Sequence, residues 1–163
     1  MRQYSIDARN IKNPIYPCPI KMGGKNANGQ MLSIGNYYLS LNGKPFFGIC
    51  GEAHFSRMNR ELWEDEIIKM KAGGLNIIAT YIFWIHHEEI EGTFDFSGNK
   101  DLRFFLELCK KNNMYVILRI GPFSHGECRN GGFPDWIYGQ PFDIRCDDPS
   151  YLYYTRRFYE QIY

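Results

Sequence analysis

Residues 114–136 read MYVILRIGPFSHGECRNGGFPDW, and this stretch decides the fold because an apolar run passes directly into a group of polar residues. The run over 114–120 is rich in β-branched and other apolar side chains, which predicts a parallel strand covered on both faces. Gly121-Pro122 ends the strand. The polar residues that follow are Ser124, His125, Glu127, Arg129 and Asn130. Polar groups at the carboxyl end of a parallel strand indicate a binding face, and a solvated loop is the alternative.

The same order of strand and polar group occurs twice earlier in the chain. A strand predicted over 47–50 opens onto Glu52, His54 and Arg57. A second strand, predicted over 75–83, opens onto a longer group made of Trp84, His86, His87, Glu88 and Glu89. Polar groups therefore follow all three predicted strands.

Helices are predicted between and after these strands. Apolar residues at helical spacing mark 60–72, capped by Asn59, and 100–112, and Pro149 begins a helix that reaches residue 163. Three βα units in a row imply parallel strands joined by right-handed crossovers. Because every strand ends in polar groups and no glycine-rich phosphate loop follows the first, the predicted α/β fold is a (β/α)8 TIM barrel rather than an open doubly wound sheet. A whole barrel needs about 250 residues, so this chain is expected to hold its first three βα units.

The N-terminal part is predicted to have two segments. Residues 1–35 contain many Pro, Gly and Asn residues with little periodicity, which predicts an irregular leader ahead of a barrel portion over 36–163. Alternating residues on either side of Asn42-Gly43 predict a β-hairpin, because this dipeptide suits a type I′ turn.

Composition narrows the classes of partner. The chain of 163 residues is 44% apolar and 17% aromatic, which predicts a globular domain. Its 19 Lys and Arg against 18 Asp and Glu give a net charge of +1, so we expect neither a nucleic-acid nor a membrane partner. The five cysteines form no CxxC pair and predict neither a disulfide framework nor a zinc knuckle. The N-terminal residues show no apolar, signal-like run, and a cytoplasmic location is expected.

The histidines and acids of the strand ends allow a metal interpretation. At the mouth of the barrel, zinc could be held by side chains from all three strand ends, namely Glu52, His54, His86, His87, His125 and Glu127. However, adjacent histidines on an extended chain should point in different directions, and a metal-dependent hydrolase barrel would have His-x-His where this chain has Glu52-x-His54. We therefore predict no metal. A buried His54 bonded to a neighbouring strand is the alternative to ligand contact.

A neutral ligand rich in hydroxyl groups explains more of the pattern. Carboxylates accept paired hydrogen bonds from neighbouring hydroxyls, and aromatic rings cover the apolar face of a sugar. Arg57 and Arg119 are predicted to brace carboxylates through paired hydrogen bonds, which guanidinium geometry favours. Carboxylates, Arg and Trp at strand ends thus predict a glycoside as substrate.

Five segments carry a resemblance to a known family. They are GEAHFSR at 51–57, KMKAGGLNIIATYIFW at 69–84 with HHE at 86–88, DFSGNKDLRFFLEL at 95–108, YVILRIGPF at 115–123, and GE at 126–127 followed by GGFPDW at 131–136. In this order they resemble successive motifs of the glycoside hydrolase family 35 β-galactosidases, over about residues 44–155. The resemblance implies a (β/α)8 barrel that removes terminal β-linked galactose with retention and uses no metal or organic cofactor.

Site residues follow from the resemblance position by position. Tyr81 matches the family's sugar-binding tyrosine, and Glu127, next to Gly126, matches the glutamate that binds galactose hydroxyls. The residues expected to support this site are His54, Arg57, Trp84, Arg119 and His125. The family's acid/base glutamate follows the fourth strand and its nucleophile a later one, and neither motif occurs in these 163 residues. No catalytic residue is therefore assigned, the pair is expected beyond residue 163, and the chain alone is expected to be inactive.

Two departures from the family pattern leave the substrate open. Residues 84–89 read WIHHEE where many members have WNxHEP, and His125-Gly126 replaces Cys-Ala. Another β-linked sugar is the alternative to galactose, and a non-catalytic carbohydrate-binding protein or a zinc hydrolase is the alternative class. Because unpaired strand edges recruit partners, an oligomer is also expected of this incomplete barrel.

Overall fold

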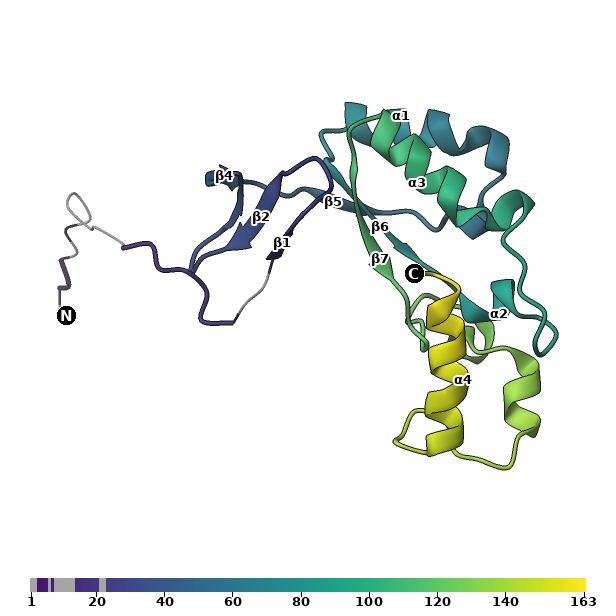
Figure 1. Cartoon of the computed structure of the whole chain (residues 1–163). Coiled ribbons are helices and arrows are strands. Elements are labelled where there is room, and N and C mark those ends of the chain that lie inside the picture. The colour runs from purple at the N-terminus through teal and green to yellow at the C-terminus, as the bar shows by residue number, and fades with distance from the viewer. Residues whose placement is uncertain (1–2, 6, 8–13, 21–22) are drawn as a thin grey trace. The chain divides into compact units, whose positions relative to one another are not determined.

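The computed structural model describes residues 3–5, 7, 14–20 and 23–163 (Figure 1). The chain divides into two compact units, Met1–Gly48 and Ile49–Tyr163.

The first unit holds a four-stranded antiparallel sheet in the order β1-β2-β3-β4. Its strands are β1 (Gly23–Lys25), β2 (Met31–Ile34), β3 (Leu39–Leu41) and β4 (Lys44–Phe46). The predicted hairpin is confirmed, because Leu41 pairs with Lys44 across Asn42 and Gly43, whose φ angles are 52° and 75°.

The prediction of an irregular leader is wrong for residues 23–34, which form β1 and β2. A side chain organises the turn between them, since Asn26 Oδ1 accepts hydrogen bonds from the N–H groups of Asn28, at 3.0 Å, and Gln30, at 2.8 Å. Such local side-chain bonds stabilise a turn without any hydrophobic periodicity. The parts of the leader prediction at 1–2, 6, 8–13 and 21–22 lie outside the described residues.

The second unit contains a three-stranded parallel sheet in the order β5-β6-β7. The strands are β5 (Cys50–Glu52), β6 (Ile77–Tyr81) and β7 (Tyr115–Arg119). Helix α1 (Trp63–Ala72) joins β5 to β6, and α3 (Leu102–Lys111) joins β6 to β7. The predicted alternation of strand and helix is therefore confirmed, with most ends shifted by one to three residues.

The other helices of this unit are short or follow the sheet. Helix α2 (Trp84–His87) comes directly after β6, and α4 (Pro149–Glu160) follows the long segment after β7. Single 3-10 turns occupy Phe55–Arg57, Arg60–Leu62, Gly98–Lys100, Arg129–Gly132 and Asp135–Gly139. In the described residues no helix combines the length and apolar character that crossing a membrane requires.

Helices α1 and α3 pack side by side and bury the core of this unit (Figure 1). Trp63 of α1 and Phe105 of α3 meet edge to face at 5.5 Å, and both are fully buried. Strand β6 has buried residues on both faces, whereas Tyr115 and Ile117 of β7 are 40% and 47% exposed. The prediction that the 114–120 strand is covered on both faces is wrong, because these two side chains alternate onto a face that the unit leaves open.

Side-chain caps begin two of the helices. Asp148 accepts from Ser150 N at 2.8 Å and confirms the predicted start of α4 at Pro149. Asp101 accepts from Phe104 N at 3.0 Å and begins α3. The predicted cap at Asn59 is wrong, since its side chain makes no cap bond and a 3-10 turn precedes α1.

Candidate functional site

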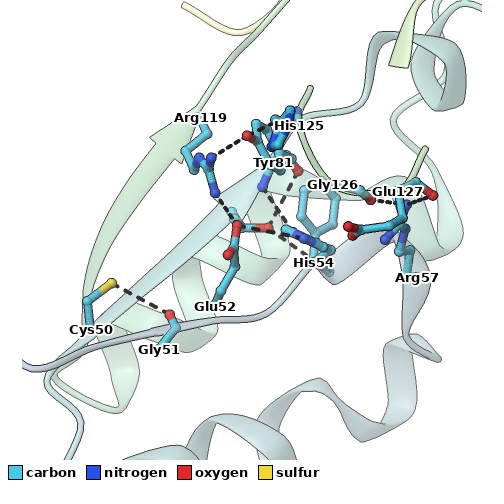
Figure 2. A network of polar contacts seen from close by, with 12 residues as sticks. Cys50, Gly51, Glu52, His54, Arg57, Tyr81, Arg119, His125, Gly126 and Glu127 are labelled. Carbon is cyan, nitrogen blue, oxygen red and sulfur yellow. Dashed lines mark hydrogen bonds and ion pairs between the residues drawn. The ribbon is translucent and has the colours of Figure 1, made fainter. Parts of the chain in front are cut away.

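The carboxyl ends of the three parallel strands bring polar side chains together (Figure 2). Glu52, Tyr81 and Arg119 are the last residues of β5, β6 and β7, and His54 follows β5 by two residues. Because parallel strands in register end at one edge, residues separated by as many as 67 positions in sequence become neighbours. Glu52, His54, Tyr81, Arg119 and the backbone of His125 are called the edge network below.

Arg119 links the strands of the edge network. Its guanidinium donates one hydrogen bond to a carboxylate oxygen of Glu52 and another to the hydroxyl oxygen of Tyr81. It also lies 3.8 Å from the centroid of the Tyr81 ring, in a cation–π contact. The predicted bracing of a carboxylate by Arg119 is confirmed, although its two bonds go to two different groups.

The hydroxyl oxygen of Tyr81 accepts a second hydrogen bond, from His125 N at 3.1 Å. Both donors are N–H groups that cannot accept, so the hydroxyl hydrogen of Tyr81 is not used in either bond. Tyr81 is therefore held as a hydrogen-bond donor toward any ligand at this edge.

His54 is held in its neutral form. Its Nδ1 accepts the backbone N–H of Tyr81 at 3.3 Å, so the proton of the neutral ring is on Nε2, which lies 3.8 Å from Glu52 Oε1. Burial lowers the pKa of His54, and Glu52 opposes this effect in part. The structure confirms the bond to a neighbouring strand.

Arg57 holds the loop after β7. Its Nη2 donates to the backbone carbonyls of Gly126 at 2.8 Å and Glu127 at 3.2 Å, and the guanidinium stacks over Phe83 at 4.5 Å. The prediction that Arg57 braces a carboxylate is wrong, because the loop, in which Glu127 has a φ of 46°, presents carbonyl groups to it. A Cβ on Gly126 would lie 3.3 Å from two carbons of the Tyr81 ring, so glycine permits the close packing of loop and ring.

Glu127 lines a cavity of about 540 Å³ beside the edge network. We call it the lateral cavity, and its lining residues are Arg57, Ile85, His86, Glu89, Glu127, Cys128, Arg129 and Asp135. Figure 2 shows Glu127 and Arg57 on one side of Gly126 and Tyr81 on the other. The two residues predicted to bind sugar thus belong to adjoining sites.

Trp84 lies apart from both sites. It is fully buried, stacks on Phe158 at 5.0 Å and donates from Nε1 to Glu88 Oε2 at 2.7 Å. Glu88, which is 1% exposed, also accepts from Arg157 Nη2 at 2.6 Å. Trp84 and Glu88 therefore stabilise the packing of α4, which contributes both Phe158 and Arg157.

The adjacent histidines face different surroundings, as predicted, although they lie in a helix. His86 Nδ1 lies 2.8 Å from Ser56 Oγ, whereas His87 is buried, stacks on Phe96 at 4.4 Å and donates from Nδ1 to Asp95 O at 3.0 Å. Burial lowers the pKa of His87 to about 4. In the described residues no three His, Cys, Asp or Glu side chains are placed to hold a metal ion.

Glu52 is a member of the edge network that was not assigned to the sugar site from sequence. Its position at the end of the first parallel strand was a usable signal, because the ends of the other two strands supply Tyr81 and Arg119.

Comparisons with known proteins show what this chain is similar to. Residues 38–163 match the family model of the glycosyl hydrolases family 35. Beta-galactosidase 11 of Arabidopsis thaliana is 41% identical over 125 residues, which are 76% of this chain and 15% of that protein. Exo-beta-D-glucosaminidase of Pyrococcus horikoshii is 39% identical over 134 residues, 69% of this chain and 17% of that protein.

A solved structure, the polyextremophilic beta-galactosidase of the Antarctic haloarchaeon Halorubrum lacusprofundi, aligns with a TM-score of 0.51 at 24% identity. The alignment covers 71% of this chain and 18% of that one, and it supports a shared fold. The chain thus spans less than a fifth of the length of each of these three proteins.

Proposed function

The chain belongs to the glycosyl hydrolases family 35, and from this membership we propose that it forms the first three βα units of a TIM barrel and supplies part of the sugar site of a retaining exo-β-galactosidase. A glycoside hydrolase of this family acts on a carbohydrate. Terminal β-linked galactose is the proposed substrate because relatives with about 40% identity include a beta-galactosidase.

The edge network is the observation that carries this proposal. It places a donor, Tyr81, beside an acceptor, Glu52, at the carboxyl ends of parallel strands, where barrel enzymes bind their substrates. Arg119 fixes both groups, which suits the recognition of a neutral molecule whose hydroxyls donate and accept.

The proposed role of these residues is to hold the sugar rather than to break its bond. A retaining mechanism needs two carboxyl groups about 5 Å apart, one as nucleophile and one as acid/base. We assign neither part to Glu52, which is bound to Arg119, or to Glu127, which lines the lateral cavity. The proposed pair belongs to the part of the family's length that this chain does not span.

The test is an assay of the full-length protein on aryl β-galactoside, with turnover expected. Glu127→Gln should weaken galactose binding, because loss of a charge-assisted acceptor costs about 1.5–3 kcal/mol, or roughly 10- to 150-fold. Glu160→Gln is the matched control, an exposed carboxylate at the end of α4. Rescue of the Glu127→Gln rate by azide would instead identify Glu127 as a catalytic carboxylate, and sugar binding without turnover would point to a non-catalytic protein.

A second candidate substrate is a terminal β-linked glucosamine. A relative named exo-beta-D-glucosaminidase is 39% identical, close to the 41% of Beta-galactosidase 11. Parallel assays on aryl β-galactoside and aryl β-glucosaminide distinguish the two, and a preference of tenfold or more for the glucosaminide would replace galactose in the proposal.

A further inference from the structure

A second, smaller hydrophobic cluster shares Tyr81 with the edge network. We call it the small core, and in the described residues it consists of Tyr81, Phe83 and Ile85, with Cys128 packed against them. Phe83 follows β6 in extended backbone, so its side chain lies on the same side of the chain as that of Tyr81. Ile82 and Trp84, which alternate with them, belong to the main core. The small core is therefore a separate packing unit next to the edge network.

Phe83 is the member of the small core with the most contacts to polar groups. Its side chain is fully buried. Its ring centroid lies 5.5 Å from the centroid of the Tyr81 ring and 5.2 Å from that of the His54 ring, which it meets edge to face. The guanidinium of Arg57 lies over the same ring, 4.5 Å from its centroid. One buried ring thus contacts two members of the edge network and the arginine that holds the loop after β7.

The loop after β7 depends on this arrangement. Arg57 donates to the carbonyls of Gly126 and Glu127, and a Cβ on Gly132 would lie 3.6 Å from Phe83 Cδ1. Glu127 has a φ of 46°, a left-handed conformation that a residue with a side chain adopts only where its surroundings hold it. The position of the Glu127 carboxylate therefore depends on Arg57, and the position of Arg57 depends on the face of the Phe83 ring.

We propose that Phe83 is a positioning residue of the sugar site. Because it is fully buried, it does not contact the ligand. Its ring holds Tyr81 directly and Glu127 through Arg57, so that the two residues proposed to bind galactose keep a fixed position relative to each other. This proposal rests on the proposed function and adds a residue that neither the strand ends nor the family resemblance assigned to the site.

The role requires an aromatic ring rather than any apolar side chain of similar size. A guanidinium is attracted by the negative face of a ring, and an edge-to-face contact between two rings depends on the same charge distribution. Leucine keeps the position apolar but provides neither interaction. Phe83→Leu therefore removes the interactions that orient Arg57 and His54 while an apolar side chain still fills much of the space.

The experiment measures galactose binding and urea unfolding of the full-length protein for wild type, Phe83→Leu and Phe105→Leu. Phe105→Leu is the matched control, because Phe105 is a fully buried phenylalanine of the main core that stacks on Phe55 at 5.4 Å. One hydrogen bond corresponds to about fivefold in affinity, and Phe83 positions two residues that bind the sugar, so Phe83→Leu should weaken galactose binding on the order of tenfold. Both variants should lose stability, but Phe105→Leu should bind galactose like the wild type. Wild-type affinity in Phe83→Leu, or an equal loss of affinity in both variants, would overturn the proposal.

The contact between Arg57 and Phe83 can also be removed from the side of Arg57, which tests the proposal if Phe83→Leu does not fold. Arg57→Met leaves the small core intact and should weaken galactose binding. In a Glu127→Gln background it should have little further effect, because Arg57 acts on the ligand through Glu127. Strictly additive effects of Arg57→Met and Glu127→Gln would contradict the proposed path from Phe83 to Glu127.

A measurement without any sugar separates this proposal from the proposed function. Cys128 is partly buried against the small core, whereas Cys146 is exposed. The rate of alkylation of each thiol by iodoacetamide is followed by mass spectrometry of the peptides. The rate at Cys128 should rise severalfold in Phe83→Leu and not in Phe105→Leu, with the rate at Cys146 unchanged in both. If the wild type neither binds nor cleaves a galactoside, the proposed function fails, and an unchanged rate at Cys128 in Phe83→Leu would still refute the role of Phe83 in holding the loop.

Discussion

Replacement of Arg119 by methionine tests the edge network directly. Methionine keeps an unbranched apolar stem but removes every hydrogen bond from Arg119 to Glu52 and Tyr81, together with the cation–π contact at 3.8 Å. We expect Arg119 to act on the ligand through Tyr81, because its guanidinium occupies an acceptor site of the Tyr81 hydroxyl oxygen. The losses of binding free energy caused by Arg119→Met and by Tyr81→Phe should therefore overlap rather than add.

The magnitude follows from the bonds involved. A neutral hydrogen bond from the Tyr81 hydroxyl to a sugar is worth about 1 kcal/mol, so Tyr81→Phe should weaken galactose binding about fivefold. Arg119→Met should weaken it by a similar factor, and the double variant by no more than about tenfold. The coupling energy is then at least about 0.6 kcal/mol, within the range for residues in contact.

Stability must be measured beside binding, because Arg119 also has a structural role. The side chain of Arg119 is 37% exposed and that of Glu52 is 47% exposed, so their ion pair contributes at most about 1 kcal/mol to stability. The cation–π contact contributes about as much again. Arg60→Met is the matched control. Arg60 pairs with Asp101 at 2.9 Å and stacks over Phe104 at 4.3 Å, away from the edge network.

The assay is isothermal titration of galactose into the four proteins of the cycle and the Arg60→Met control, with unfolding in urea for each. We expect Arg60→Met to lose stability like Arg119→Met and to bind galactose like the wild type. Strictly additive effects of Arg119→Met and Tyr81→Phe on binding would refute the argument, as would an equal loss of binding in Arg60→Met.

Three further predictions concern stability. The pKa of His87 falls from 6.5 to about 4 on folding, so the unfolded chain binds the proton more strongly than the folded chain. Up to about 3 kcal/mol of the free energy of unfolding should therefore be lost as the pH falls from 6.5 to 4. The urea midpoint should depend on pH over this range in the wild type, and this dependence should be weaker in His87→Phe. Gly51→Ala places a Cβ 2.0 Å from Leu75 Cδ2 and should cost about 1–3 kcal/mol, whereas Gly139→Ala, with no neighbour inside 4 Å, should cost less than about 1 kcal/mol; thermal melting compares the two. Glu88→Ala leaves a partly buried Arg157 without its carboxylate and should cost about 3 kcal/mol in urea unfolding, so a loss below about 1 kcal/mol would contradict the buried pair.

The parts of the fold that sequence predicts well are those that bury a periodic apolar surface. The strand at β6 and the apolar face of α3 are apparent from residue spacing, and the structure confirms both. Strands β1 and β2 cannot be predicted in this way, because GGK and MLSI are only three and four residues long and are held by the turn at Asn26. A short strand without a buried face has no pattern to detect.

The site also contains residues that sequence predicts and residues that it does not. Strand ends predict which side chains share an edge, because parallel strands in register end together, and Tyr81 and Arg119 follow this rule. Trp84 does not, because α2 turns it inward against Phe158, a residue 74 positions later whose contact no local pattern contains. The partners of Arg57 could not be predicted from sequence either, because they are backbone carbonyls whose direction depends on how the loop at Glu127 folds.

The directions of the hydrogen bonds in the edge network restrict the kind of ligand more than the residue types of the network do. Arg119 can only donate, so it makes the oxygen of Tyr81 an acceptor and leaves the Tyr81 hydrogen for the ligand. The bond from Tyr81 N to His54 Nδ1 leaves His54 a donor at Nε2. Glu52 can only accept, and an ionised carboxylate has about four lone-pair sites, more than Arg119 occupies. A ligand here meets donors and an acceptor side by side. An ammonium group would satisfy only Glu52 and a carboxylate only Tyr81 and His54, whereas one hydroxyl group satisfies both kinds, which is why the network favours a sugar over a charged metabolite.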